Sequence, residues 1–171
     1  MSTPTLPATE LSPTLLRWLL ALRPGPAASL AAAVLAITDA VEIPSSSDLQ
    51  ETGAAFERDG DLLPAGEAAV VGDVLTSAVA LIRVGTADAV AALVAVGRDR
   101  VLVLTPDGRG GQEAAALSAD VSAGTAVASI AERVGVEAAV LAAIPYGEIV
   151  SLPLGQDLAE RVDQILNGLL A

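Results

Sequence analysis

The sequence predicts an α+β fold in which an antiparallel β-meander sheet packs against helices. Four apolar runs between Ser77 and Val121 are joined by short turn sequences, which favours consecutive strands that pair antiparallel. Segments on both sides of this region repeat apolar residues with a helical period. Hydrophobic residues make up 53% of the chain and aromatic residues 2%, so the core must consist of Ala, Val, Leu and Ile.

The 171 residues suit one domain of moderate size. Residues 1–10 are rich in Thr and Pro and are expected to form a disordered arm, and residues 11–171 a single α+β domain. In "LSPTLLRWLLALRPG", Ser12 is expected as the N-cap of a helix and Pro13 as its first residue, with Trp18 as a core anchor. "PAASLAAAVLAITDA" favours a second helix, although its apolar run is ambiguous in period.

The segment "IPSSSDLQETGAAFERDGD" is typical of the end of one element followed by the start of a helix. Ser47 and Gln50 are expected to form a capping box, and a short helix carrying Leu49 and Phe56 is expected to end at Gly60. Pro64 is expected to open the next helix, "PAGEAAVVGDVLTS". The acids of "ERDGDLLPAGE" lack the alternating ligand pattern of a calcium loop, so a solvated helix end is the preferred interpretation.

The next four runs predict the meander itself. The second run, "ADAVAALVAVG", is apolar at nearly every position, so both faces of that strand should be covered. "TPDGRGG" is expected to be a hairpin turn, because it lacks the Lys and the Ser or Thr of a phosphate-binding loop. After the meander, "SAGTAVASIAERVG" predicts a helix that ends at Gly135.

The remaining sequence predicts a Pro-Tyr-Gly turn, a brief strand "EIVSL" and a final amphipathic helix. In that helix, "DLAERVDQILNGLLA", a stripe from Leu158 to Leu169 faces inward and charged residues face outward.

Composition excludes several classes of function. The formal net charge is −12, which disfavours nucleic-acid binding. The chain has no Cys and no His, which removes disulfides, thiol nucleophiles, Cys or His metal sites and every His-based catalytic triad. We therefore expect no enzyme and no cofactor, although a small-molecule site built from carboxylates stays open as an alternative.

Membrane insertion is not expected either. The longest run without a charged residue, Pro24 to Thr38, is shorter than the roughly 20 residues that a spanning helix needs. The first ten residues, "MSTPTLPATE", carry no basic residue ahead of an apolar stretch, unlike a signal peptide. We therefore expect a cytoplasmic protein.

Arginines within the meander are the candidate binding residues. Arg83, Arg98 and Arg100 make this region locally balanced or slightly basic in an otherwise acidic chain, and Arg83 interrupts an apolar strand that also holds Leu81. Arg among small apolar residues is typical of interface cores, so these four residues are the predicted partner-binding set. The alternative is that the arginines lie on a solvated face with their stems along apolar surface.

Several segments resemble the EspG-type chaperones associated with type VII (ESX) secretion in actinobacteria. The resembling segments are "LQETGAAFERDGDLLPAGEAAVVGDVLTSAVALIRV", "VAVGRDRVLVLTPDG", "LSADVSAGTAVASIAERVG" and "LAAIPYGEIVSLPLGQDLAERV". They span about residues 49–163 and resemble roughly the N-terminal half of the family only. The resemblance implies an EspG-like half-domain without a catalytic site, which keeps PE–PPE-type helical secretion substrates soluble by binding them.

The family contains two related halves, and this chain ends soon after the first. We expect that two copies could pair and supply each other's missing half. The alternative function is therefore a structural homodimer or assembly subunit that uses the sheet face for self-association.

Overall fold

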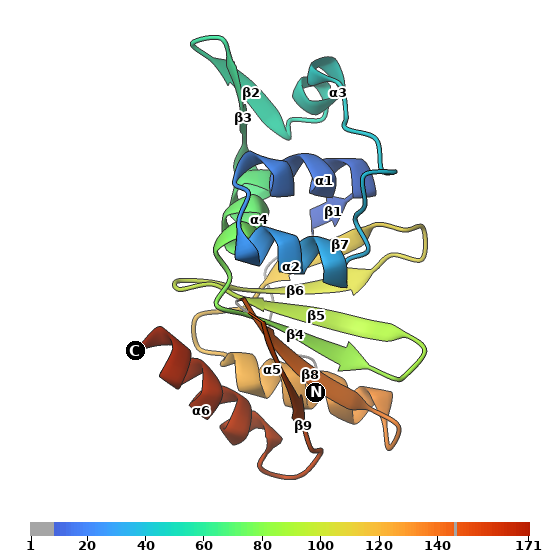
Figure 1. Cartoon of the computed structure of the whole chain (residues 1–171), viewed down its shortest axis with the longest axis vertical. Helices are drawn as coiled ribbons and strands as arrows, with labels where there is room; N and C mark the ends of the chain where they lie inside the picture. The colour runs from blue at the N-terminus through green and yellow to red at the C-terminus, as the bar shows by residue number, and fades with distance from the viewer. Residues whose placement is uncertain (1–8, 146) are drawn as a thin grey trace.

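A seven-stranded antiparallel sheet with helices on both faces forms the body of the protein (Figure 1). The computed structural model describes residues 9–145 and 147–171. The helices are α1 (Pro13–Leu22), α2 (Pro26–Val34), α3 (Ser46–Glu51), α4 (Gly66–Ser77), α5 (Ala123–Val134) and α6 (Leu158–Leu170). The strands are β1 (Thr9–Leu11), β2 (Ala55–Arg58), β3 (Asp61–Pro64), β4 (Ala80–Gly85), β5 (Val90–Val96), β6 (Val101–Pro106), β7 (Gln112–Ala116), β8 (Ala139–Ile144) and β9 (Glu148–Leu152).

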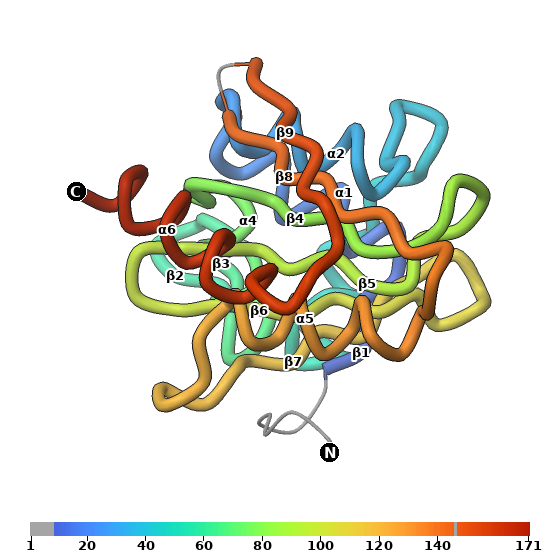
Figure 2. Tube along the Cα trace, turned by 90° about the horizontal axis from the view of Figure 1, so that it is seen from below, coloured from blue at the N-terminus to red at the C-terminus, as the bar shows by residue number. Residues whose placement is uncertain are grey.

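The strand order is β1-β7-β6-β5-β4-β8-β9, so the predicted meander of β4 to β7 is confirmed. Helices α1, α2 and α4 lie above the sheet in Figure 1, and α5 and α6 lie below it. Figure 2, seen from below, shows α5 and α6 crossing the near face with α1 and α2 beyond the sheet. The fold is therefore three layers, and the α+β class is confirmed.

The sheet separates two hydrophobic cores. The first core, under α1, α2 and α4, takes Leu81, Leu93, Ala95, Leu102, Leu104 and Ala114 from the sheet. The second core, under α5 and α6, takes Ala80, Ile82, Val84, Ala92, Val94, Val96, Val140, Ala142 and Leu152. Successive residues of a strand point to opposite faces, so β5 contributes to both cores, as its unbroken apolar sequence predicted.

The first helix follows its sequence signals. Ser12 Oγ accepts a hydrogen bond from Leu15 N at 3.2 Å, Pro13 is the first helical residue, and Trp18 is 8% exposed in the first core. Residues 1–8 of the predicted arm lie outside the described residues, whereas Thr9 and Glu10, also assigned to that arm, pair with β7.

The predicted helix from residue 26 to residue 40 ends early, at Val34. Ala36 adopts a left-handed backbone with φ 56°, which a continuous helix does not allow. Arg17 of α1 holds the segment that follows: its Nη1 donates to the carbonyl oxygens of Asp39, at 2.8 Å, and of Val41.

The segment between Ser45 and Pro64 differs most from its prediction. The cap of α3 is Ser45, whose Oγ accepts from Asp48 N at 3.2 Å, and not Ser47. Phe56 lies on β2 of a two-stranded hairpin, so the predicted helix up to Gly60 and the solvated helix end are wrong. Pro64 ends β3, and α4 begins at Gly66.

A two-residue turn explains this hairpin. Asp59 and Gly60 connect β2 and β3 with φ of 54° and 85°. Positive φ at both central residues is the type I′ geometry, whose twist matches that of paired strands and which Asp-Gly sequences favour.

The C-terminal part of the chain adds two strands to the sheet and the two helices that cover its second face. Strand β8, which was not predicted, pairs with β4, so β4 lies inside the sheet. Helix α5 ends at Gly135 with φ 99°, and the predicted strand β9 and helix α6 are confirmed. Helix α5 approaches α6 closely at Gly124, whose N donates to Asp163 Oδ1 at 2.9 Å.

Helix length bears directly on membrane insertion. Across residues 9–145 and 147–171, every helix is too short or too polar to cross a bilayer.

Candidate protein-binding surface

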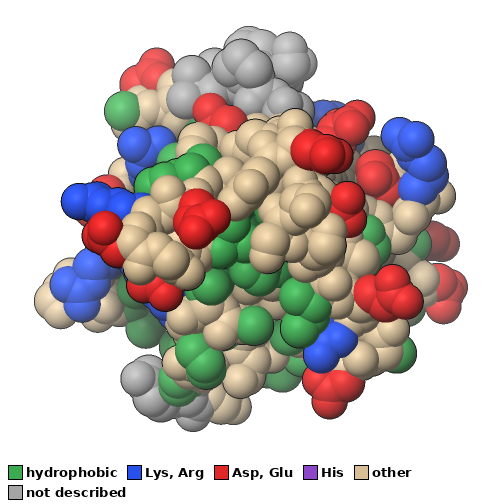
Figure 3. Space-filling view, turned by 90° about the horizontal axis from the view of Figure 1, so that it is seen from above, with side chains coloured by type: hydrophobic (Ala, Val, Ile, Leu, Met, Phe, Trp, Pro, Cys, Tyr) green, Lys and Arg blue, Asp and Glu red, His purple; other side chains and the backbone are tan. Residues whose placement is uncertain are grey.

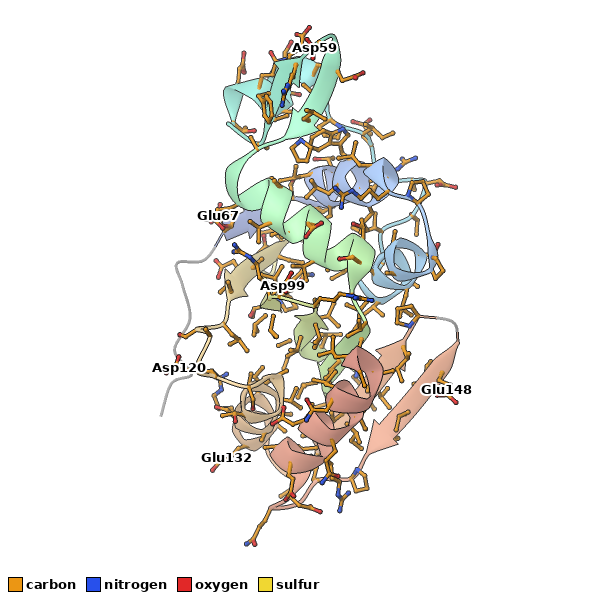
Figure 4. The ribbon with its side chains drawn as sticks, turned by 90° about the vertical axis from the view of Figure 1, so that its left-hand side faces the viewer. Asp59, Glu67, Asp99, Asp120, Glu132 and Glu148 are labelled. Atoms are coloured by element: carbon orange, nitrogen blue, oxygen red, sulfur yellow. The ribbon has the colours of Figure 1, made fainter. Side chains whose placement is uncertain are left out.

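The turn between β5 and β6, Gly97 to Arg100, forms one end of the sheet. Gly97 N donates to Arg100 O at 2.9 Å, which closes the turn. A Cβ added at Gly97 would lie 3.2 Å from Arg100 O, a tight contact within the turn, and 3.5 Å from Val74 Cγ1 of α4, an ordinary van der Waals contact. Arg98, Asp99 and Arg100 are exposed at this turn. Figure 4 shows Asp99 on this end, between α4 and α6.

A hollow of about 900 Å³ lies on one side of the turn. Arg98 and Arg100 border it together with the loop that precedes α5 and the last turns of α6. Val101, Leu117 and Leu170 contribute apolar side chains, and Leu170 is 42% exposed. The hollow therefore combines apolar surface with two guanidinium groups and with the carboxylates of Asp99 and Asp163.

A smaller hollow of about 350 Å³ lies on the other side. It is bordered by Arg98, by the C-terminal end of α4, and by Ile144, Pro145 and Leu169. Arg98 thus stands between two hollows, and we call Arg98, Arg100 and these two hollows the turn surface.

The two arginines of the turn surface form no ion pair within the described residues, and Asp99 lies between them in the sequence. Within the described ranges, neither guanidinium has an ion-pair or hydrogen-bond partner, whereas the neighbouring Arg23 pairs with Asp73 at 2.8 Å. An exposed guanidinium is a ready bidentate donor to a carboxylate. The turn surface can therefore bind an acidic group beside an apolar one.

The other two predicted residues lie elsewhere. Arg83 is half-buried on β4, where its Nη2 donates to Thr86 O at 3.1 Å. Arg83 lies three residues, or roughly 10 Å, from Ala80 at the start of β4. The turn surface lies beyond Ala80, so Arg83 is not part of it. Leu81 is 1% exposed in the first core, so its side chain is not on the surface.

The turn surface also contains residues that sequence reasoning missed. Leu117 and Leu170 are far from the turn in sequence, and the fold brings them beside it. The only sequence signal was that Leu170 follows the apolar stripe of the last helix without belonging to it.

The sites considered and set aside from the sequence have structural roles. Asp107 Oδ1 accepts from Arg109 N at 2.7 Å and from Gly111 N at 3.1 Å, so the "DGRGG" segment is the hairpin turn that was predicted. Among the residues that the structure describes, no three His, Cys, Asp or Glu side chains are grouped as metal ligands.

A second exposed apolar surface lies at the opposite end of the molecule. Phe56 and Leu63 face each other across the β2–β3 hairpin and are 44% and 37% exposed. Seen from this end, acidic, basic and apolar side chains are interspersed (Figure 3). Arg58 of β2 is also exposed at this end and forms no ion pair within the described residues. The turn surface differs in having two such arginines within one turn, both bordering a hollow.

No family model matches the chain, and no curated protein matches its sequence.

Proposed function

We propose that this chain is a non-enzymatic chaperone or adaptor that binds a helical protein segment at its turn surface. The observation that supports this most is the exposed pair Arg98 and Arg100, without partners in the described chain, beside a partly apolar hollow of about 900 Å³. Interfaces are enriched in arginine around apolar pockets, and a helix can insert its apolar side chains into such a groove.

Charge supports the choice of this surface over the rest of the molecule. The chain carries a net charge of −12, so most of its surface repels an acidic partner. The turn surface is where a partner carboxylate meets two guanidinium groups within one turn. A partner of this kind would present carboxylates beside an apolar helical stripe.

The class of partner rests on the sequence resemblance. The segments that resemble EspG-type chaperones include the turn itself, "VAVGRDRVLVLTPDG". We propose a PE–PPE-type substrate of type VII secretion as the partner, bound in the cytoplasm before export. Helix α3, the β2–β3 hairpin and α4, which precede the meander, are compatible with this partner class but are not evidence for it.

Titration of a purified PE–PPE pair into the full chain tests the proposal. The double variant R98E/R100E should bind about 10- to 100-fold more weakly, because two charge-assisted contacts become repulsive. Its free energy of unfolding should stay within about 0.5 kcal/mol of that of the unmodified chain, as for exposed sites.

A matched control separates local contacts from net charge. R58E/R109E makes the same change in charge at two other exposed arginines that have no ion-pair partner in the described chain. It should leave affinity unchanged within about twofold at moderate salt, because charges beyond a Debye length are screened. Equal loss in both variants, or no binding of any PE–PPE pair, would contradict the proposal.

A further inference from the structure

Strand β9 is an outer edge of the sheet that has little protection against pairing. In the part of the chain that the structure describes, β9 pairs with β8 only, so its outward backbone groups have no strand partner. Edge strands are usually blunted by Lys, Pro, bulges or very short length. The strand Glu148–Leu152 has a regular register with β8 and a single charge, at its first residue. The opposite edge, β1, is only three residues long.

One face of β9 is also uncovered. Ile149 is 69% exposed and pairs with Ala143 on the face of the sheet that α1, α2 and α4 cover elsewhere. In Figure 1 no helix lies in front of β8 and β9, and Figure 4 shows Glu148 at the outer margin of the molecule. A second strand could therefore approach β9 from outside without displacing a helix.

We propose that two copies of this chain pair antiparallel through β9, about a two-fold axis at Val150, so that one sheet continues across both molecules. This inference goes beyond the proposed function, because β9 is not part of the turn surface. Two-fold pairing uses the same strand from both copies and closes after two molecules.

Backbone geometry restricts the register. In a strand, alternate residues point their N–H and C=O groups outward, and antiparallel strands exchange bonds only where two such residues are opposite. A two-fold axis must therefore pass through a residue and not between two residues. An axis at Val150 is the one that pairs all five residues of β9, since an axis at Ile149 or Ser151 leaves one end unpaired.

The side chains favour the same register. With the axis at Val150, Glu148 faces Leu152 of the second copy, Ile149 faces Ser151, and Val150 faces itself. No like charges are opposite, and a β-branched pair lies at the centre. An axis at Ser151 would instead place Ile149 opposite Pro153, which cannot donate to the ladder. The strand is therefore complementary to itself, which argues for a second copy as the occupant.

Net charge predicts how the association responds to salt. Each copy carries −12, so two copies repel one another at long range. Salt screens this repulsion, and the backbone bonds of β9 are local. Association should therefore strengthen as ionic strength rises, unlike the binding of an acidic partner by arginines.

The absence of cysteine allows a clean crosslinking test of the register. In V150C the two introduced thiols lie directly opposite, at a Cα separation of roughly 4.5–5.5 Å, which a disulfide spans. In I149C or S151C the two copies of the residue are offset by two positions, on the order of 8 Å apart, beyond disulfide reach. Under mild oxidation V150C should form covalent dimer about tenfold faster than either control.

Charge variants test the same pairing without crosslinks. In I149E/S151E, glutamates of the two copies lie opposite each other twice, so sedimentation should show a monomer of 17.0 kDa. In I149E/S151K, opposite charges replace like charges at the same positions, and the dimer should return. Both changed residues are exposed, so at a protein concentration low enough to dissociate the dimer the urea midpoints of both variants should match that of the unmodified chain.

Several results would overturn the proposal. One is that the unmodified chain sediments as a monomer even at high concentration and high salt. Another is that I149E/S151E dimerises as well as the unmodified chain. Equal crosslinking of V150C and the two controls would reject this register, and open-ended polymers would indicate pairing of β9 with a different edge.

Discussion

Replacing Gly124 by alanine should lower the free energy of unfolding by about 2–4 kcal/mol, because α5 and α6 cannot stay in contact around a methyl group. A Cβ at this position would lie 2.1 Å from Ala159 O and 2.7 Å from Asp163 Oδ1. Both atoms belong to α6, and the closer one is backbone, so the two helices must separate by more than an ångström.

Three contributions give the magnitude. Overpacking costs about 1–3 kcal/mol, and losing the bond from Gly124 N to the Asp163 carboxylate costs about 1.5–3 kcal/mol. The higher helix propensity of alanine offsets at most about 1 kcal/mol. One separation of the helices both relieves the overlap and breaks the bond, so the two costs do not add fully and the net cost is about 2–4 kcal/mol. For a chain of this size the change corresponds to a fall in Tm of roughly 5–15 °C.

Urea unfolding followed by circular dichroism measures this, with Gly168→Ala in α6 as the control. Gly168 has no atom within 4 Å of an added Cβ, so its replacement should stabilise the helix by up to about 1 kcal/mol. A Gly124→Ala variant whose urea midpoint equals that of the unmodified chain would refute the claim that the close approach of α5 and α6 requires glycine.

Two further substitutions examine the core and the hairpin. Leu81→Ala should lower stability by about 2–5 kcal/mol, whereas Leu22→Ala, at a residue 41% exposed, should change it by less than about 0.5 kcal/mol; equal effects in denaturant would show that Leu81 is not a core residue. Gly60→Ala should cost about 1 kcal/mol, because φ is 85° and no neighbour blocks a methyl group, and a proteolysis assay at the hairpin should show faster cleavage. Unchanged stability and cleavage would reject the type I′ turn.

The meander could be predicted because its signals are local. Short apolar runs joined by Gly- and Asp-containing turns leave few alternatives to antiparallel neighbours. The unbroken apolar sequence of β5 indicated that both of its faces are buried, and the two cores of the structure confirm this. These inferences need no knowledge of distant segments.

The hairpin and β8 were missed for different reasons. Leu49 and Phe56 have helical spacing, which concealed the stronger Asp59–Gly60 signal for a type I′ turn. The run that forms β8, "AVLAAI", is too short for its period to distinguish strand from helix. Three consecutive serines likewise do not show which of them caps α3, because the cap depends on where the backbone becomes helical.

The candidate site was predictable only in part. An excess of arginine pointed to Arg98 and Arg100, which are exposed at one turn. Period-two alternation places Leu81 and Arg83 on the same face of β4. The sequence does not show that the layer of α1, α2 and α4 covers Leu81 and leaves Arg83 half-buried. The hollows arise from segments far apart in sequence, so no local pattern contains them.

The division of the interior into two cores has a consequence for synthesis on the ribosome. Every element that contributes to the first core precedes residue 117, whereas the second core needs α5 and α6. A nascent chain that has emerged through β7 can complete the first core, yet Ile82, Val84, Val94 and Val96 then face water on the other side of the same sheet. This aliphatic face of the sheet stays exposed until about fifty more residues have emerged. During that interval the nascent chain is most prone to aggregate.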